Sequence, residues 1–196
     1  PFHYLVADAA GAAIVIEYTA AGLTIHDNPV NAITNDPTFD WHLTNLSNYI
    51  GLQAENRETI TVGDLTLATF GQGSGMIGLP GDFSSPARFV RAVAFANTAL
   101  PSATGDEAVF QAFHILNAFD IPKGAVRETG ATEMHTDYTV WSSASDTASR
   151  SYYFKTYKTQ AIEKIDVRAA LDGLHAPAVL TMESGFVVRD RTKDFR

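Results

Sequence analysis

Asn35 lies in the segment Thr-Asn-Asp-Pro-Thr-Phe of residues 34–39, where a short strand is expected to pass into a helix. The side-chain N–H of an asparagine at such a strand end can donate to an oxyanion, the charged oxygen that forms when a nucleophile attacks an amide carbonyl. A turn asparagine that bonds its own backbone is the structural alternative. Asn35 is therefore a candidate catalytic residue, and its surroundings in the sequence leave both interpretations open.

A second candidate is Arg88, which follows the segment Gly-Leu-Pro-Gly-Asp-Phe-Ser-Ser-Pro-Ala of residues 78–87. Ser84 and Pro86 predict that a helix begins here, and Arg88 then falls in its first turn. Because the helix dipole disfavours a cation at that end, a positive side chain there indicates an interaction outside the helix. A surface ion pair would explain Arg88 as well as a functional contact would.

Other familiar chemistries find little support in the sequence. The six histidines are scattered, with no pair at the four-residue spacing of a helical zinc motif, and we expect His114 to be structural. Five glycines fall within residues 71–81 without a following Gly-Lys-Ser/Thr, so a close-packed loop is expected there and not a phosphate loop. The chain has no Gly-x-Ser-x-Gly motif and no cysteine, so it carries no thiol nucleophile of its own.

The elements expected to position the two candidates lie in the first hundred residues. A helix is predicted from Asp36-Pro37, with Pro37 at its first position, to Gly51, and another over residues 84–100. Apolar runs separated by turns predict strands over residues 3–6, 12–18, 23–27, 30–34 and, in part, 60–70.

The second half of the chain is predicted to hold one helix, over residues 106–119, followed by strands. A polar loop over residues 142–150 would join the two strands of a hairpin. The strands expected here cover residues 132–143, 151–159, 161–167 and 179–182. Strands, then helices, then strands again indicate an α+β layered fold.

Composition excludes several classes of function. The 196 residues are 45% hydrophobic and 18% charged, which is typical of a globular chain with a sizeable core. With 22 acidic and 14 basic residues the net charge is −8, and the absence of a basic cluster argues against a nucleic acid as partner. No apolar run reaches the roughly 18 residues of a membrane span, so no membrane partner is expected.

Two long motifs carry a resemblance to a known family. The first reads DNPV…TNDP…F…LTNL…Y over residues 27–49, and the second reads GLPGD…SS…RFVR over residues 78–91. The opening HY…D…G…IE of residues 3–17 and the hairpin of residues 138–157 fit as well. Together they resemble the choloylglycine hydrolase family, which includes the bile salt hydrolases and penicillin V acylases, over nearly the whole chain.

The resemblance implies an N-terminal nucleophile (Ntn) hydrolase with a four-layer αββα sandwich. In this family the mature chain begins with a cysteine, whose thiol attacks the amide carbonyl while its own α-amino group acts as the base. Asn35 would match the asparagine that donates to the oxyanion. Arg88 would match the arginine that lies beside the nucleophile and stabilises charge there.

This chain departs from the family in having no cysteine and in starting at Pro1. We therefore expect residues 1–196 to be the C-terminal portion of a single Ntn hydrolase domain, incomplete by itself. The nucleophile is expected on a companion N-terminal segment. Without that segment, sheet edges and half of a core would be exposed.

The resulting function hypothesis is hydrolysis of a linear amide: a conjugated bile salt, penicillin V or an N-acyl homoserine lactone. The alternative is a non-catalytic binding or scaffold subunit that kept the fold. No cofactor or metal is expected, the whole enzyme would be a possible homotetramer, and a periplasmic or cytoplasmic location is left open. Four apolar residues around the glycines would line an acyl pocket or pack in a core: Phe70, Met76, Ile77 and Phe83.

Overall fold

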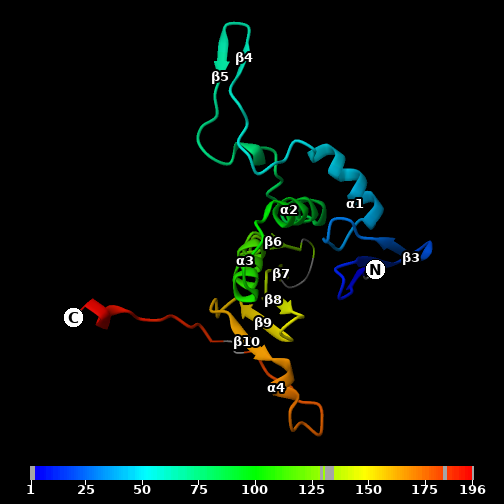
Figure 1. Cartoon of the computed structure of the whole chain (residues 1–196), viewed down its shortest axis with the longest axis vertical. Helices are drawn as coiled ribbons and strands as arrows, with labels where there is room; N and C mark the ends of the chain where they lie inside the picture. Colours follow the sequence, from blue (N-terminus) through cyan, green and yellow to red (C-terminus); the bar gives the residue numbers. More distant parts are fainter. Residues whose placement is uncertain (1–2, 129, 131–134, 183–184, 196) are drawn as a thin grey trace. The chain divides into compact units, whose positions relative to one another are not determined.

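The computed structural model, drawn as a ribbon in Figure 1, describes residues 3–128, 130, 135–182 and 185–195. The chain divides into two compact units. Unit 1 is Pro1–Leu100 and unit 2 is Pro101–Arg196. The expected membership of both units in a single domain stays a prediction.

Unit 1 begins with a three-stranded antiparallel sheet of order β1-β2-β3. The three predicted strands are confirmed, because β1 is His3–Ala7, β2 is Ala13–Thr19 and β3 is Gly22–Asp27. The turn between β1 and β2 is fixed by Asp8, whose side chain accepts hydrogen bonds from the backbone N–H groups of residues 10 and 12.

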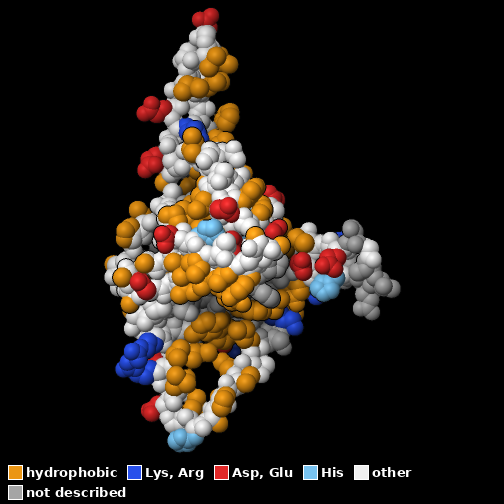
Figure 2. All heavy atoms as spheres, turned by 90° about the vertical axis from the view of Figure 1, so that its right-hand side faces the viewer, with side chains coloured by type: hydrophobic (Ala, Val, Ile, Leu, Met, Phe, Trp, Pro, Cys, Tyr) orange, Lys and Arg blue, Asp and Glu red, His pale blue; other side chains and the backbone are white. Residues whose placement is uncertain are grey.

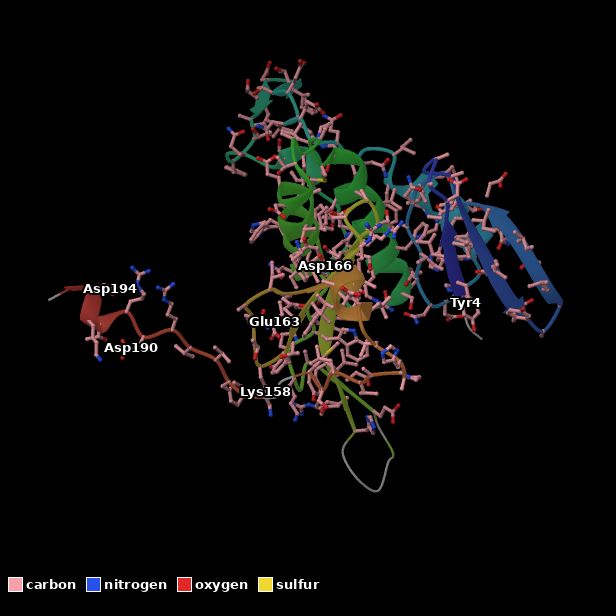
Figure 3. All side chains as sticks on the ribbon, turned by 60° about the horizontal axis from the view of Figure 1, so that its bottom comes forward. Tyr4, Lys158, Glu163, Asp166, Asp190 and Asp194 are labelled. Carbon is pink, nitrogen blue, oxygen red and sulfur yellow. The ribbon has the colours of Figure 1, made fainter. Side chains whose placement is uncertain are left out.

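The two faces of this sheet differ in burial. On one face Val15 and Glu17 of the central strand β2 are fully buried. On the other face large apolar side chains are about half exposed, and Tyr4, labelled in Figure 3, packs edge-on against Tyr18. The exposed set comprises Tyr4, Val6, Tyr18, Leu23 and Ile25. Figure 2 shows many hydrophobic side chains at the molecular surface.

The chain between β3 and the first helix differs from its prediction. Residues 30–34 form no strand, because the Asn28 side chain bonds the backbone at both Val30 and Ala32 and closes a turn. Helix α1 is Phe39–Asn45, with Thr38 at its N-cap position but without a capping bond from that side chain, and it continues as the short 3-10 helix η1, Leu46–Tyr49. The expectation that Pro37 opens the helix is wrong, since the Asp36–Pro37 peptide is cis and lies before it.

A hairpin, a glycine-rich loop and a long helix complete unit 1. The hairpin is β4, Ile60–Val62, with β5, Leu65–Leu67. The close approach expected in the loop is confirmed at Gly75 in the 3-10 helix η2, Ser74–Met76, where a Cβ would lie 2.0 Å from a backbone oxygen. Helix α2 follows as Ser85–Thr98.

The hydrophobic core of unit 1 joins the sheet to both helices. Val15 of β2, Ala32 of the turn, Phe39 of α1 and Phe89 of α2 form one buried cluster. The rings of Phe39 and Phe89 meet edge-to-face, with centroids 6.0 Å apart. The core therefore holds together the segments that carry Asn35 and Arg88.

Unit 2 packs helix α3, Gly105–Asn117, on an antiparallel sheet of order β10-β9-β8. Val109 and Phe113 of α3 form a buried cluster with Tyr153 of the sheet. The other elements are β6, Val126–Arg127; β7, Thr136–Asp137; β8, Trp141–Asp146; β9, Ser151–Thr156; β10, Glu163–Asp166; α4, Val167–Leu171; and the 3-10 helix η3, Thr192–Phe195.

The predicted hairpin is confirmed as β8 paired with β9, although its loop is shorter than expected because β8 extends to Asp146. The strand expected over residues 179–182 is wrong, since these residues form no strand. Part of the strand expected over residues 132–143 lies outside the described residues. Both units combine helices with antiparallel sheets, which confirms the α+β class.

Candidate functional site

Asn35 and Arg88, 53 residues apart in the chain, are in direct contact. Nη2 of Arg88 donates to Oδ1 of Asn35 at 2.7 Å and to Oγ of Ser85 at 3.0 Å. The positive charge of Arg88, which the helix dipole disfavours at this end of α2, thus has a hydrogen-bond partner outside the helix, namely Asn35. The structure brings the two sequence candidates together within unit 1.

The contact with Arg88 fixes the orientation of the Asn35 side chain. A guanidinium can only donate hydrogen bonds, so the atom of Asn35 that faces it has to be the oxygen. The Nδ2 group then points away, and no described residue accepts a hydrogen bond from it. Because Asn35 is exposed, its N–H is available to a bound ligand.

Arg88 is a partly buried cation. Burial lowers its pKa below the ordinary arginine value, and the nearby positive charge of Arg91 adds to that effect. The guanidinium stays protonated, because arginine does not lose its proton in proteins. Its Nε atom is buried and has no hydrogen-bond partner among the residues that the structure describes.

The turn that carries Asn35 is tied to its surroundings on both sides. Before it, Oγ1 of Thr34 donates to the backbone oxygen of Ser85 at 3.3 Å, and the Thr34 carbonyl lies 2.9 Å from Nδ1 of His3. After it, the N–H of Phe39 donates to Oε1 of Glu17 at 2.7 Å. These bonds involve β1, β2 and α2, so three elements of unit 1 hold the turn that carries Asn35.

Glu17 and the histidines around it were not among the candidate site residues, although His3 and Glu17 lie in the opening motif of residues 3–17. Glu17 is fully buried, with Nδ1 of His3 3.3 Å from one carboxylate oxygen and Nε2 of His26 3.5 Å from the other. The three residues come from three different strands, which no motif spacing reveals. One signal was present, namely a glutamate inside the apolar run of residues 13–18.

Arg91 fixes the loop of the second motif. Its Nη1 donates to the backbone oxygens of Pro80 and Asp82 at 2.8 and 2.7 Å. The Asp82 carboxylate in turn accepts from Ser84, and these hydrogen bonds hold the pKa of Asp82 below its usual value. The loop before α2 is therefore held by one buried arginine.

Two expectations about individual side chains need correction. Core packing does not explain Phe70 and Ile77, because both are exposed, while their role in an acyl pocket stays a prediction. His114 is exposed on α3, so the expected buried structural role is wrong.

Unit 2 contains a second polar cluster, centred on the buried Lys155. Its Nζ donates to Oδ1 of Asn117, to Oδ2 of Asp120 at 3.0 Å and to Oε1 of Gln160 at 3.2 Å. An ammonium group has three hydrogens, and all three have an acceptor here. The cluster is therefore complete without a ligand.

Neither metal ligation nor membrane insertion is indicated in the described parts of the chain. No group of three or more His, Asp or Glu side chains there is placed to hold a metal ion. Within the same residues, no helix has both the length and the apolar character needed to cross a bilayer.

Comparisons with known proteins identify the family. Residues 1–176 match the model described as linear amide C–N hydrolases, choloylglycine hydrolase family. The chain is 38% identical to a bile salt hydrolase/transferase of Clostridium perfringens over 87% of its length and 51% of that protein. A bile salt hydrolase/transferase of Lactiplantibacillus plantarum is also 38% identical, over 85% of this chain and 50% of the relative. The chain thus spans about half the length of these curated relatives.

Solved structures show the same similarity. A cysteine-to-alanine mutant of conjugated bile acid hydrolase from Clostridium perfringens matches with a TM-score of 0.83 and 34% identity, over 97% of this chain and 57% of that one. A penicillin V acylase from Agrobacterium tumefaciens shares the fold with a TM-score of 0.64 and 24% identity, over 85% of this chain and 45% of that one. The expected α+β fold of the Ntn hydrolase type is thereby confirmed. The chain belongs to the choloylglycine hydrolase family of linear amide C–N hydrolases.

Proposed function

We propose that this chain supplies the oxyanion donor and the charge-stabilising arginine of a cysteine amidohydrolase. The observation that carries the proposal is the bond from Arg88 to Oδ1 of Asn35, because it turns the Asn35 N–H outward and leaves it free to donate. Family membership supports hydrolysis of a linear C–N amide as the reaction.

The proposed chemistry follows from the groups that such a site combines. A thiolate attacks the amide carbonyl, and the α-amino group of the same cysteine takes the thiol proton, since its pKa of about 7.7–8.0 suits transfer near neutral pH. Asn35 donates to the oxygen that becomes negative, and the positive charge of Arg88 stabilises the same intermediate. The amine then leaves with a proton, and water hydrolyses the thioester.

The nucleophile would come from a companion N-terminal segment. This chain has no cysteine and covers about half of its relatives, one of which has been solved as a cysteine-to-alanine mutant. The half-exposed apolar face of β1–β3 supports the same proposal, because an exposed apolar surface of this kind is typical of an interface. We propose that the companion segment covers this face.

Among the substrate classes, a conjugated bile salt is the leading proposal. Both named relatives are bile salt hydrolase/transferases, whereas the penicillin V acylase is similar at a level that supports the fold alone. Penicillin V and N-acyl homoserine lactones stay as alternative substrates, and a homotetramer of the whole enzyme stays a prediction. The alternative function is a binding or scaffold subunit without catalysis.

The decisive experiment purifies the chain together with any segment that accompanies it and determines the N-terminal residue of that segment. A cysteine there, with hydrolysis of glycine- or taurine-conjugated cholate, is the expected result. Penicillin V and an N-acyl homoserine lactone are assayed in parallel. No turnover of any amide would reject the enzyme proposal, and a companion beginning with a residue other than Cys, Ser or Thr would favour the scaffold alternative.

The companion proposal has a separate test that needs no substrate. The chain is produced by itself, and its oligomeric state and thermal unfolding are measured. Aggregation or non-cooperative unfolding is expected, because the apolar sheet face would be uncovered. A monomer that unfolds cooperatively would contradict the need for a companion segment.

A further inference from the structure

We propose that Glu17, buried beneath the turn of residues 34–39, is a positioning residue that fixes where the Asn35 carboxamide lies. The inference rests on the proposed function, because it assigns a role toward the oxyanion donor of that site. Glu17 itself has no route to a substrate, since its side chain is fully buried.

The first argument is that a buried carboxylate is costly and needs a reason. Moving an ionised group out of water costs several kcal/mol unless it is paired and hydrogen-bonded, and an apolar residue of similar size is often as stable. Val15, two residues earlier on the same strand face, shows that this core accepts an apolar side chain. Packing alone therefore does not account for a glutamate here.

The second argument is the placement of its contacts, one on each side of Asn35. Directly, Oε1 accepts the Phe39 N–H at 2.7 Å, four residues after Asn35. Indirectly, Oε1 lies 3.3 Å from Nδ1 of His3, and that nitrogen lies 2.9 Å from the Thr34 carbonyl. Because a carbonyl only accepts, Nδ1 carries the hydrogen, and a neighbouring carboxylate favours that arrangement.

The third argument is that only one of the two carboxylate oxygens of Glu17 has a hydrogen bond, and that bond comes from the turn. Its second oxygen, Oε2, has no hydrogen-bond partner among the described residues, and Nε2 of His26 is 3.5 Å away. The oxygen that accepts a hydrogen bond, Oε1, is the one that binds the turn. Together with Thr34 and Arg88, Glu17 thus leaves the Asn35 backbone and side chain little freedom to move.

The test compares Glu17→Gln with Glu17→Leu in the chain purified with any accompanying segment. Gln keeps an oxygen for the Phe39 N–H, whereas Leu removes both tethers. A misplacement of about 1 Å at a catalytic group can cost on the order of 10²-fold in rate. We expect Glu17→Leu to lower kcat by about 10- to 100-fold with little change in KM, and Glu17→Gln to restore most of it.

The matched control is Glu107, another glutamate that accepts backbone N–H groups at a helix start. It binds the N–H groups of Ala103 and Thr104 at the beginning of α3, in unit 2. Glu107→Leu removes the same kind of bond without touching Asn35, so it should leave kcat unchanged. If Glu17→Leu fails to fold, His3→Leu replaces it, because that change removes the tether at Thr34 and the contact of His3 with Glu17 but keeps the Phe39 bond.

A second readout does not depend on turnover. Hydrogen exchange of the Phe39 amide and the NMR signals of the Asn35 side-chain amide are recorded for the same variants. Faster exchange and shifted Asn35 signals in Glu17→Leu, largely reversed in Glu17→Gln, are expected. If the wild-type protein hydrolyses no amide, the proposed function fails while these spectra still decide the positioning role. Unchanged kcat together with unchanged Asn35 signals in a folded Glu17→Leu would overturn the inference.

Discussion

Each unit buries one charged side chain on a central strand, and the two are treated very differently. In unit 2, Lys155 on β9 has an acceptor for each of its three ammonium hydrogens. In unit 1, Glu17 on β2 has one carboxylate oxygen committed to the turn before α1, while the other has no hydrogen-bond partner among the described residues. We therefore expect the Lys155 cluster to act on the stability of unit 2, and Glu17 to act through the turn that it holds in place.

Arg88 follows the pattern of Glu17. Its Nη2 donates hydrogen bonds to Asn35 and Ser85, while its buried Nε has no hydrogen-bond partner in the described part of the chain. Arg88 contacts Asn35 directly, and Glu17 binds the end of its turn at Phe39. The comparison predicts that substitutions here act on catalysis, whereas substitutions in the unit 2 cluster act on stability.

The largest effect is expected for Asn35→Ala, which removes the proposed oxyanion donor. Loss of one such donor typically lowers kcat by about 10²- to 10³-fold. Because Asn35 is exposed, the free energy of unfolding should change little. Steady-state kinetics on the conjugated amide, with urea denaturation of the same samples, measure both quantities.

Asn35→Asp tests whether Asn35 acts by donating its N–H to the oxyanion or only by accepting the hydrogen bond from Arg88. A carboxylate still accepts the bond from Arg88 but has no N–H to offer an oxyanion. It should therefore be as slow as Asn35→Ala. Activity close to wild type in Asn35→Asp would contradict the donor role and place the contribution of this residue in its contact with Arg88.

The sequence was sufficient for most strands, for α2 and α3, and for naming Asn35 and Arg88 as candidates in two separate motifs, whereas their direct contact emerges only in the structure. The predicted features follow from local periodicity or from long, ordered motifs. The turn after β3 was mispredicted because residues 30–34 read as a strand, while the Asn28 side chain bonds the backbone and ends the extended conformation. Side-chain bonds of that kind leave no periodic signal.

The surroundings of Asn35 were predicted least well, for a related reason. His3, Glu17 and His26 meet only because β1, β2 and β3 pair in one register, with His3 opposite Glu17 and Val15 opposite His26. A one-residue slip would send each side chain to the other face. The sequence marks Glu17 as unusual in an apolar strand, but the partners depend on that register.

In unit 2, Lys155→Met should destabilise the fold by about 3 kcal/mol, at the lower end of the cost of breaking a buried ion pair. The lower end applies because the Asp120 side chain is 36% exposed and can recover water. Asn117 and Gln160 are exposed as well, so water can also replace the lysine at their side-chain oxygens. Urea denaturation gives the free energy of unfolding.

The kcat of Lys155→Met tests whether the unit 2 cluster takes part in the reaction. Below the unfolding transition, kcat per folded molecule should equal that of the wild type, because the Lys155 cluster is complete without a ligand. A selective loss of kcat in Lys155→Met would mean that this cluster serves the reaction, and the contrast with Glu17 would fail.

A smaller effect is expected from the protonation of His42, which is 1% exposed and stacks on Phe89. Burial lowers the pKa of His42, and the backbone at Asp36 offsets only part of this. The unfolded chain, with a histidine pKa near 6.5, then binds the proton more readily, so stability falls as the pH drops below about 6.5. His42→Phe should remove this part of the pH dependence.

Unfolding free energies measured between about pH 7.5 and 5 check the sign of the His42 effect. The control is His114→Gln, a histidine substitution at an exposed position of α3. An unaltered slope in His42→Phe, or an equal change in both variants, would show that His42 does not couple folding to pH.

The smallest effect is expected at the start of α3, where Thr104 and Glu107 form a capping box. Oγ1 of Thr104 accepts the Glu107 N–H at 3.2 Å, and the Glu107 carboxylate accepts the Thr104 N–H at the same distance. Thr104→Ala should cost about 1 kcal/mol of stability, as the loss of an N-cap typically does, while Thr104→Ser keeps the hydroxyl and most of that stability. Because the cap is exposed and belongs to unit 2, kcat should be identical in both variants. A drop in kcat that Thr104→Ser reverses would link this helix to the reaction and break the division of roles between the two units.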